Sequence, residues 1–126
     1  MPSFLLDSVI VIDYLNQIPQ AHSFLDEYAD HSVLSVVTAA EVLVGVDEQA
    51  ESVVLQFLDR FSLLNVERNS ALRAARLRRR HGWHLPHAFQ AALAHEHDCQ
   101  LATRNTKDFD PDAHAFVHVP YRWSAS

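Results

Sequence analysis

The chain has 126 residues, of which 48% are hydrophobic, and it carries a formal net charge of −6 at pH 7. This length and apolar content predict a single domain over residues 1–126 and argue against wholesale disorder, while the acidic balance argues against a general nucleic-acid coat protein. The one cysteine, Cys99, excludes an internal disulfide framework and a multi-cysteine zinc site. It fits a reducing compartment, and the absence of a signal-peptide pattern or a membrane-length apolar run predicts a cytoplasmic protein without membrane contacts.

The first half of the chain alternates short apolar runs with helical patterns. The run "SFLLD" at residues 3–7 is typical of a buried parallel strand, and a helix or helical turn follows from Ser8. After it we predict, in chain order, a helix at residues 19–30 opened by Pro19, a strand at 31–36, and helices at 38–46 and about 51–61.

The second half continues this alternation. We predict a strand at residues 62–66, an arginine-rich helix at 70–81 with Gly82 as its C-cap, a helix at 86–97, and strands at 99–105 and 115–120. Strands that alternate with helices predict an α/β fold with a mainly parallel sheet covered on both faces. Ligand sites in such sheets lie at the carboxyl ends of the strands, which directs attention to Asp7, to the segment after Val36 and to Asn105.

Two carboxylates each have a functional and a structural interpretation. Asp7 follows the first strand directly, where it could ligate a hard cation such as Mg²⁺ or act as the N-cap of the next helix. Glu41 lies in the apolar stretch "TAAEVLVGV", where burial is costly unless the carboxylate is paired or bound to a metal. However, Thr38-x-x-Glu41 also matches a capping box, in which Glu41 would reach back to the Thr38 amide.

Asn105 and Asp108 lie in "ATRNTKDFD", just after the fourth predicted strand. Asn, Asp and Thr are ordinary turn residues, so a purely structural role is reasonable. Arg104 and Lys107 beside them could contact a phosphate, or they could neutralise the neighbouring acids Asp108 and Asp110.

Five of the ten basic residues lie in "RAARLRRR", at residues 73–80. A local basic stripe can hold phosphates even on an acidic protein, and Arg73, Arg76 and Arg80 are the candidates here. A solvated helix face is the alternative interpretation. The sequence does not decide between the two.

Four stretches carry a family resemblance over residues 4–120: "FLLDSVIVIDYL", "SVVTAAEVLVGV", "LRRRHGWHLPHAFQAALAHEHDCQLATRN" and "TKDF". With these stretches, in this order, the sequence resembles PIN domains, in particular the VapC-type toxins of bacterial toxin–antitoxin pairs. The resemblance implies a three-layer α/β/α sandwich and a homodimer. It also implies ribonuclease activity that depends on Mg²⁺ or Mn²⁺ and is blocked by a cognate antitoxin, VapB-like in kind.

Carried over residue by residue, the resemblance makes Asp7 the first metal-binding carboxylate and Glu41 the second. Asn105 stands after Thr-Arg, where the family has Asp or Asn, and Asp108 is the nearby acid often found when that position is Asn. The resemblance therefore implies that these four residues bind the metal and that Asp7, Glu41 and Asp108 act in catalysis.

His87 departs from the family pattern at the third carboxylate. The family usually has Leu-Pro-Asp-Ala, and the same place here reads "LPHA", with Pro86 expected to open a helix and His87 to be its second residue. Imidazole lacks the negative charge and the hard oxygen of Asp; it suits Mn²⁺ better than Mg²⁺, and it suits softer metals such as Zn²⁺ well. The site could therefore bind without cleaving, use Mn²⁺ or a softer metal, or work weakly with the remaining carboxylates.

The neighbouring histidines also raise a separate zinc or nickel site. Gly82 and Pro86 would break any continuous helix that aligned His81, His84 and His87. The other two histidines of the group are two residues apart, so they would point to different faces of a helix. A dedicated histidine site is therefore the less favoured interpretation. The histidines concerned are His81, His84, His87, His95 and His97.

Three functions compete at this point. The first is a metal-dependent endoribonuclease toxin that uses Asp7, Glu41, Asp108 and His87, with RNA phosphates contacted by Arg73, Arg76, Arg80 and Arg104. The second is a weakened or inactive PIN-like domain that binds an antitoxin or RNA without cleavage. The third, an unrelated phosphotransfer domain with Asp7 as nucleophile, lacks a second acid at position 9 and a glycine-rich phosphate loop. An antitoxin would place a helix in an apolar groove near the helices between residues 19 and 61.

Overall fold

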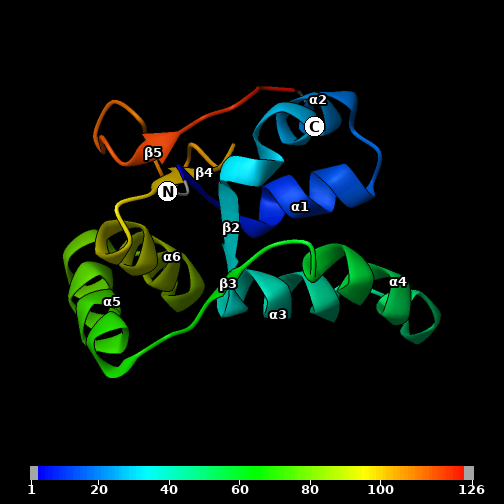
Figure 1. Cartoon of the computed structure of the whole chain (residues 1–126). Coiled ribbons are helices and arrows are strands. Elements are labelled where there is room, and N and C mark those ends of the chain that lie inside the picture. The colour runs from blue at the N-terminus through cyan, green and yellow to red at the C-terminus, as the bar shows by residue number, and fades with distance from the viewer. Residues whose placement is uncertain (1–2, 124–126) are drawn as a thin grey trace.

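In the computed structural model, which describes residues 3–123, five short strands form one sheet in the order β3-β2-β1-β4-β5 (Figure 1). Every neighbouring pair of strands is parallel, which confirms the predicted parallel sheet. The strands are shorter than expected, because Asp7 and Ser35 at the ends of the first two already cap the helices that follow. They are β1 (Phe4–Leu6), β2 (Ser32–Ser35), β3 (Leu63–Leu64), β4 (Gln100–Ala102) and β5 (Val117–His118).

The connections between the strands are helical. Gly82 ends the arginine-rich helix in the left-handed conformation, with φ 73°, which confirms its predicted role as a C-cap. No helix within residues 3–123 combines the length and the apolar character that crossing a membrane would require. The helices are α1 (Ser8–Leu15), α2 (Pro19–Tyr28), a 3-10 helix η1 (Ala29–His31), α3 (Val36–Val44), α4 (Glu48–Leu58), α5 (Arg68–His81) and α6 (Leu85–Glu96).

Side chains of the central strand alternate between two cores, one on each face of the sheet. Phe4 and Leu6 of β1 pack with residues of α1 to α4, whereas Leu5 between them packs with Trp83 and with residues of α6. Figure 1 shows the same division, with α5 and α6 on one side of the sheet and α1 to α4 on the other. The molecule is therefore the three-layer α/β/α sandwich that the resemblance implied.

Helix α5 lies against α6 rather than against the sheet. Three fully buried alanines, Ala74, Ala88 and Ala92, form the contact, and their small side chains allow the two helices to approach closely. The buried residues of α5 are thus small, namely Ser70 and Ala74, and the arginines of this helix lie on its exposed faces.

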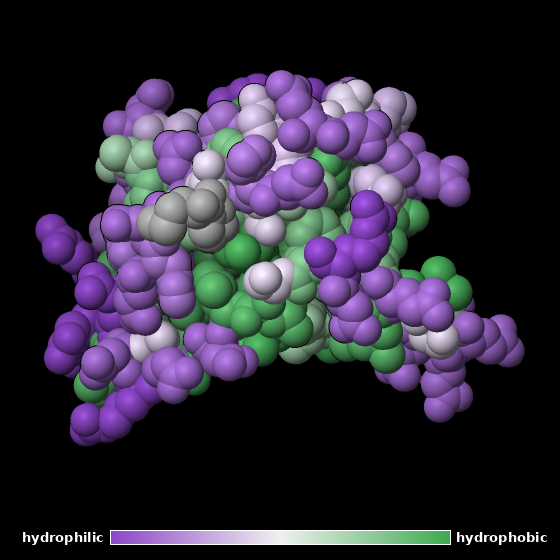
Figure 2. Space-filling model, viewed as in Figure 1, coloured by the Kyte–Doolittle hydropathy of each residue, from purple (hydrophilic) through white to green (hydrophobic). Residues whose placement is uncertain are grey.

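The edge strand β3 leaves apolar surface uncovered. Its Leu63 is 42% exposed, although it is flanked by the buried Phe61. Figure 2 shows apolar side chains gathered in a hollow between the α5–α6 pair and α3, with polar side chains on the surrounding helices. Exposed apolar surface at the edge of a sheet is typical of a place where another protein binds.

A buried polar network joins α3, α6 and the end of β1. Gln90 of α6 is fully buried; its Oε1 accepts a hydrogen bond from Ser35 Oγ at 2.8 Å, and its amide group donates to Thr38 Oγ1. The Thr38 hydroxyl in turn donates to the carbonyl of Leu6 at 3.0 Å. Since each buried polar group has a partner, the network fixes α3 and α6 against the strand end that precedes Asp7.

Replacing Gln90 with Ala should test this network. The variant leaves the hydroxyls of Ser35 and Thr38 without their partner and opens a cavity, so the free energy of unfolding should fall by about 2–4 kcal/mol. Urea denaturation followed by circular dichroism measures the change. Gln56→Ala, at an exposed position of α4, is the matched control, for which we expect a change below about 0.5 kcal/mol. Equal losses in the two variants would contradict the role of the network.

Candidate active site

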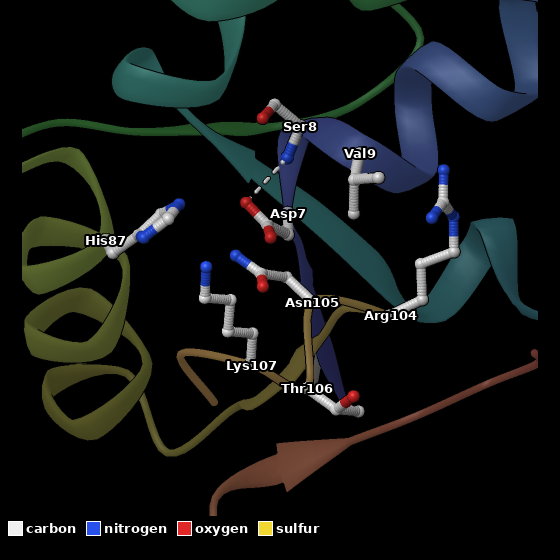
Figure 3. Close-up of a pocket in the computed structure, with 8 residues that line it drawn as sticks. All are labelled: Asp7, Ser8, Val9, His87, Arg104, Asn105, Thr106 and Lys107. Carbon is white, nitrogen blue, oxygen red and sulfur yellow. Dashed lines mark hydrogen bonds between the residues drawn. The ribbon is translucent and has the colours of Figure 1, made fainter. Parts of the chain in front are cut away.

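A cavity of about 380 Å³ lies at the carboxyl ends of β1 and β4, beside the first turn of α6 (Figure 3). The backbone amide of Asp7 donates to the carbonyl of Ala102, so the residues that follow the two strands are held next to each other. The cavity thus lies where the parallel sheet predicted a ligand site. Its lining residues are Asp7, Ser8, Val9, His87, Arg104, Asn105, Thr106 and Lys107.

Asp7 is buried, with 2% of its surface exposed, and both of its carboxylate oxygens are held. Oδ1 accepts a hydrogen bond from the Ser8 amide at 2.9 Å, and Oδ2 accepts one from Thr103 Oγ1 at 2.7 Å. Asp7 therefore caps α1, as one of its two interpretations predicted, and it also lines the cavity. Its role as a metal ligand stays a prediction. Burial raises the pKa of its carboxyl group, although the hydrogen bond from Thr103 and the proximity of His87 oppose this rise.

Glu41 of α3 carries a buried oxygen, Oε1, that has no hydrogen-bond partner among residues 3–123. Burial raises the pKa of Glu41, and the charge of Asp7 raises it further. The capping-box interpretation of Glu41 was wrong, because α3 begins at Val36 and its N-cap is Ser35, whose Oγ accepts from the Thr38 amide at 3.0 Å. Glu41 lies instead on a later turn of α3, close enough to Asp7 for the two carboxylates to repel each other.

His87 is the third residue of α6, not the second, because the helix begins at Leu85. Its buried Nδ1 lies 3.2 Å from Oδ2 of Asp108, but the angle is unsuitable for a hydrogen bond. A positive charge on this imidazole would lower the pKa of both Asp7 and Glu41. His87 is thus in contact with one predicted site carboxylate and within electrostatic range of the other two.

Asn105 and Asp108 are joined to each other. Asn105 Nδ2 donates to Asp108 Oδ2 at 3.2 Å, so this oxygen meets both the amide of Asn105 and the ring of His87. The backbone of Asn105 is fixed as well, since its amide donates to Thr103 Oγ1 at 3.0 Å. Asp108 is therefore partly engaged by protein groups, whereas Glu41 keeps an oxygen without a partner.

The pair Asp7 and Glu41 fits a divalent cation. Two carboxylates that repel each other, one with an orphaned buried oxygen, are stabilised when a cation binds between them. No three His, Cys, Asp or Glu side chains in the part of the chain that the structure describes are arranged to hold a metal by themselves. A cation here would take its other ligands from water or substrate, as Mg²⁺ commonly does. Among these described residues, the five histidines considered above do not form such a group either.

Arg104 lies in a cluster that sequence reasoning did not find. Its guanidinium donates two hydrogen bonds to the buried Asp13, at 2.6 and 3.0 Å, and stacks over the ring of Trp123 at 4.6 Å. Asp13 also accepts from Tyr121 Oη at 2.8 Å and from Trp123 Nε1 at 3.0 Å. Burial alone would raise the pKa of Asp13, but these four hydrogen bonds hold it below its ordinary value. A guanidinium engaged in this way is less available to a phosphate than the sequence suggested.

The candidate arginines of α5 lie outside the cavity. Arg76 and Arg80 are exposed, and Arg73 Nε is 3.8 Å from a carboxylate oxygen of Glu96. A contact of these arginines with phosphates remains a prediction. Thr103 is the residue that sequence reasoning missed at the centre of the site; its signal was its position beside Arg104 and Asn105 at the end of a strand.

Comparisons with known proteins identify the family and the fold. The family described as PIN domain matches residues 4–111. A chain of a toxin–antitoxin complex from Klebsiella pneumoniae is 32% identical, with a TM-score of 0.89 over 96% of this chain and 100% of that one. Two other structures share the fold. A chain of FitAcB from Neisseria gonorrhoeae is 24% identical, with a TM-score of 0.74 over 93% of this chain and 97% of that one. A chain of DNA-bound VapBC from Salmonella typhimurium is 17% identical, with a TM-score of 0.74 over 87% of this chain and 92% of that one. A search of curated proteins gave no significant match.

Asp7→Asn should raise the melting temperature of the metal-free protein at pH 7. The pKa of the Asp7 carboxyl group is raised in the folded protein. Its ionisation therefore destabilises the fold as pH rises from the pKa of the unfolded chain, about 3.9, through the pKa of the folded protein. The neutral amide of Asn does not ionise and so avoids this loss of stability. Thermal unfolding in EDTA and in Mn²⁺ measures the effect. Mn²⁺ should raise the melting temperature of the original chain but not that of the variant; an equal rise in both would place the cation elsewhere.

Asp13→Asn should lower the free energy of unfolding by about 2–3 kcal/mol at neutral pH, because it breaks a buried ion pair. The folded pKa of Asp13 is depressed, so the stability it provides is complete above the unfolded pKa of about 3.9 and is lost as pH falls through the folded value. The difference between the two proteins should therefore shrink in acid, as measured by urea denaturation from pH 7 to pH 2. Asp26→Asn, at an exposed position of α2, should show no such pH-dependent difference.

Proposed function

Because this chain belongs to the PIN-domain family, we propose that it is the toxin of a VapBC-type pair and an endoribonuclease that hydrolyses RNA phosphodiester bonds with Mg²⁺ or Mn²⁺. The observation that carries this proposal is the pair of Asp7, at the end of β1, and Glu41 of α3. These two carboxylates repel each other, and Glu41 has a buried oxygen without a partner among residues 3–123. Without a bound cation such a pair destabilises the folded protein, and a divalent cation would stabilise it.

The residues of the chain would act as follows. Asp7 and Glu41 would hold the cation, which when bound lowers the pKa of a water ligand and offsets charge on the phosphoryl oxygens. Thr103 and the Ser8 amide fix both oxygens of Asp7 before substrate binds, so little reorganisation is needed. Asp108 is oriented by Asn105. His87 has Nδ1 buried against Asp108, which leaves Nε2 as the nitrogen that could bind a metal or a proton.

A second candidate function is a PIN-like module that binds antitoxin or RNA without cleaving it. His87 favours this alternative, because imidazole takes the place of a carboxylate and lies against Asp108, whose Oδ2 is already contacted by Asn105. Of the three proposed site carboxylates, Glu41 is then the one that keeps a buried oxygen without a hydrogen-bond partner among residues 3–123. Mn²⁺ or a softer metal would suit such a site better than Mg²⁺.

The proposed partner is a VapB-like antitoxin. The Klebsiella pneumoniae relative belongs to a toxin–antitoxin complex, and apolar surface suited to a partner is present on this chain. One example is a small hollow between α1 and α3 lined by Ile12, Leu15 and Val42, near the helices between residues 19 and 61. Exposed Leu63 at the sheet edge offers a second apolar contact, for the antitoxin or for a second copy in a homodimer. An RNA substrate would place the proposed activity in the cytoplasm.

Cleavage of a structured RNA in Mg²⁺, Mn²⁺ or Zn²⁺ tests the proposed activity. The original chain should cleave, and Asp7→Asn should lower the rate at least about 100-fold, since it removes a metal ligand and its charge. Asp26→Asn, purified in the same way, is the matched control and should keep full activity. Fragments resolved on a denaturing gel give the rates.

His87→Asp separates the two candidate functions. If the original site is active with a metal preference changed by His87, this variant should shift the metal preference of cleavage from Mn²⁺ toward Mg²⁺. Cleavage by His87→Asp alone, and not by the original chain, would support the binding module. If neither protein cleaves RNA and neither gains thermal stability with any of the three metals, the proposed catalytic function is wrong.

A further inference from the structure

We propose that Lys107 is the phosphate-binding cation of the cavity, where its ammonium group contacts a non-bridging oxygen of the RNA backbone. This inference rests on the proposed function and adds a residue that contacts the substrate. Lys107 is the only lysine of the chain, since the other nine basic residues are arginines. It lines the same cavity as Asp7, and Figure 3 shows its side chain directed toward His87 and Asn105.

The backbone around Lys107 is fixed on both sides. Before it, the Asn105 amide donates to Thr103 Oγ1 at 3.0 Å; after it, the Phe109 amide donates to the Asn105 carbonyl at 3.0 Å. Phe109 is fully buried, and Trp83 Nε1 donates to the carbonyl of Asp108 at 2.9 Å. The turn that carries Lys107 is thus held by the core, so tertiary structure fixes the point at the cavity from which its side chain extends.

Lys107 is the cation of the cavity that remains available. Two basic side chains line the cavity, but Arg104 is bound to Asp13 by two hydrogen bonds and stacked on Trp123. By contrast, no carboxylate among residues 3–123 forms an ion pair with Lys107. A carboxylate at position 87 would offer the ammonium group a partner nearby. The imidazole of His87 does not, which leaves the charge of Lys107 for a ligand.

The charges of the cavity are separated in a way that suits a phosphodiester. Buried Asp7 lies at its base and can bind a cation, while the exposed Lys107 lies at its rim and can bind an anion. A phosphate group needs positive charge on more than one oxygen, and a lysine provides a compact point charge with three donors. Ser8, Asn105 and Thr106 also line the cavity and provide neutral polar groups, and Figure 3 shows the side chain of Asn105 between Asp7 and Lys107. An RNA phosphate can therefore bridge the bound cation and Lys107.

Binding to a fluorescein-labelled single-stranded RNA tests this proposal. It is measured by anisotropy in the original chain with Mn²⁺ at low temperature, and a denaturing gel verifies that the RNA stays intact. Adding Lys107→Ala should weaken binding about tenfold and reduce the slope of log affinity against log salt by about 0.7, the value for one lost contact to a single strand. Lys107→Arg should retain most of the affinity. Arg60→Ala removes one exposed cation beyond the end of α4 and is the matched control for net charge.

Each outcome has a definite meaning. Loss with Lys107→Ala, but not with Arg60→Ala, in proteins of equal melting temperature supports the proposal. Equal effects of the two substitutions, or no effect of Lys107→Ala on affinity or slope, overturn it while leaving the proposed function in place. A Lys107→Ala variant that binds RNA normally but loses its antitoxin also overturns it. No RNA binding by the original chain, together with no cleavage by it or by His87→Asp, overturns both this proposal and the proposed function.

Discussion

The hydrogen bond from Thr103 Oγ1 to Oδ2 of Asp7, at 2.7 Å, joins the ends of two neighbouring strands inside the protein. It exists because β1 and β4 are parallel and in register, with Leu6 opposite Ala102, so the next residue of each strand lies at the same edge. The same Thr103 oxygen accepts from the Asn105 amide and so fixes the turn that carries Asn105, Lys107 and Asp108. The position of every proposed site residue after β4 depends on this pairing.

The two buried carboxylates of the candidate site destabilise the folded protein. Burial raises the pKa of Asp7 and Glu41, which means that their charged forms are disfavoured in the folded protein. The surrounding structure offsets this cost through the buried network of Gln90, Ser35 and Thr38 and through the apolar cores on the two faces of the sheet. Functional sites commonly retain such unfavourable interactions, because a ligand relieves them.

Two basic residues of one turn have different roles because of their surroundings. Arg104 points toward α1, where buried Asp13 and the ring of Trp123 match the planar guanidinium. Lys107, three residues later, points into the cavity, where no acid pairs with it in residues 3–123. The first stabilises the fold, and the second is the residue that we propose binds substrate. His87 contributes to this difference, since it places a ring where a carboxylate would compete for the ammonium group.

The sequence alone determined the order and type of the elements, because apolar runs and helical periodicity depend only on which side chains must be buried. It also determined the cap at Gly82 and, through local motifs, the family, and it predicted Asp7 and His87 as site residues. Tertiary structure decided what depends on residues far apart in the chain. It showed that Ser35 rather than Thr38 caps α3, that Asp13 binds Arg104 across 91 positions, and that Thr103 holds Asp7. No local pattern encodes such contacts, since they form only when the parallel sheet brings strand ends together.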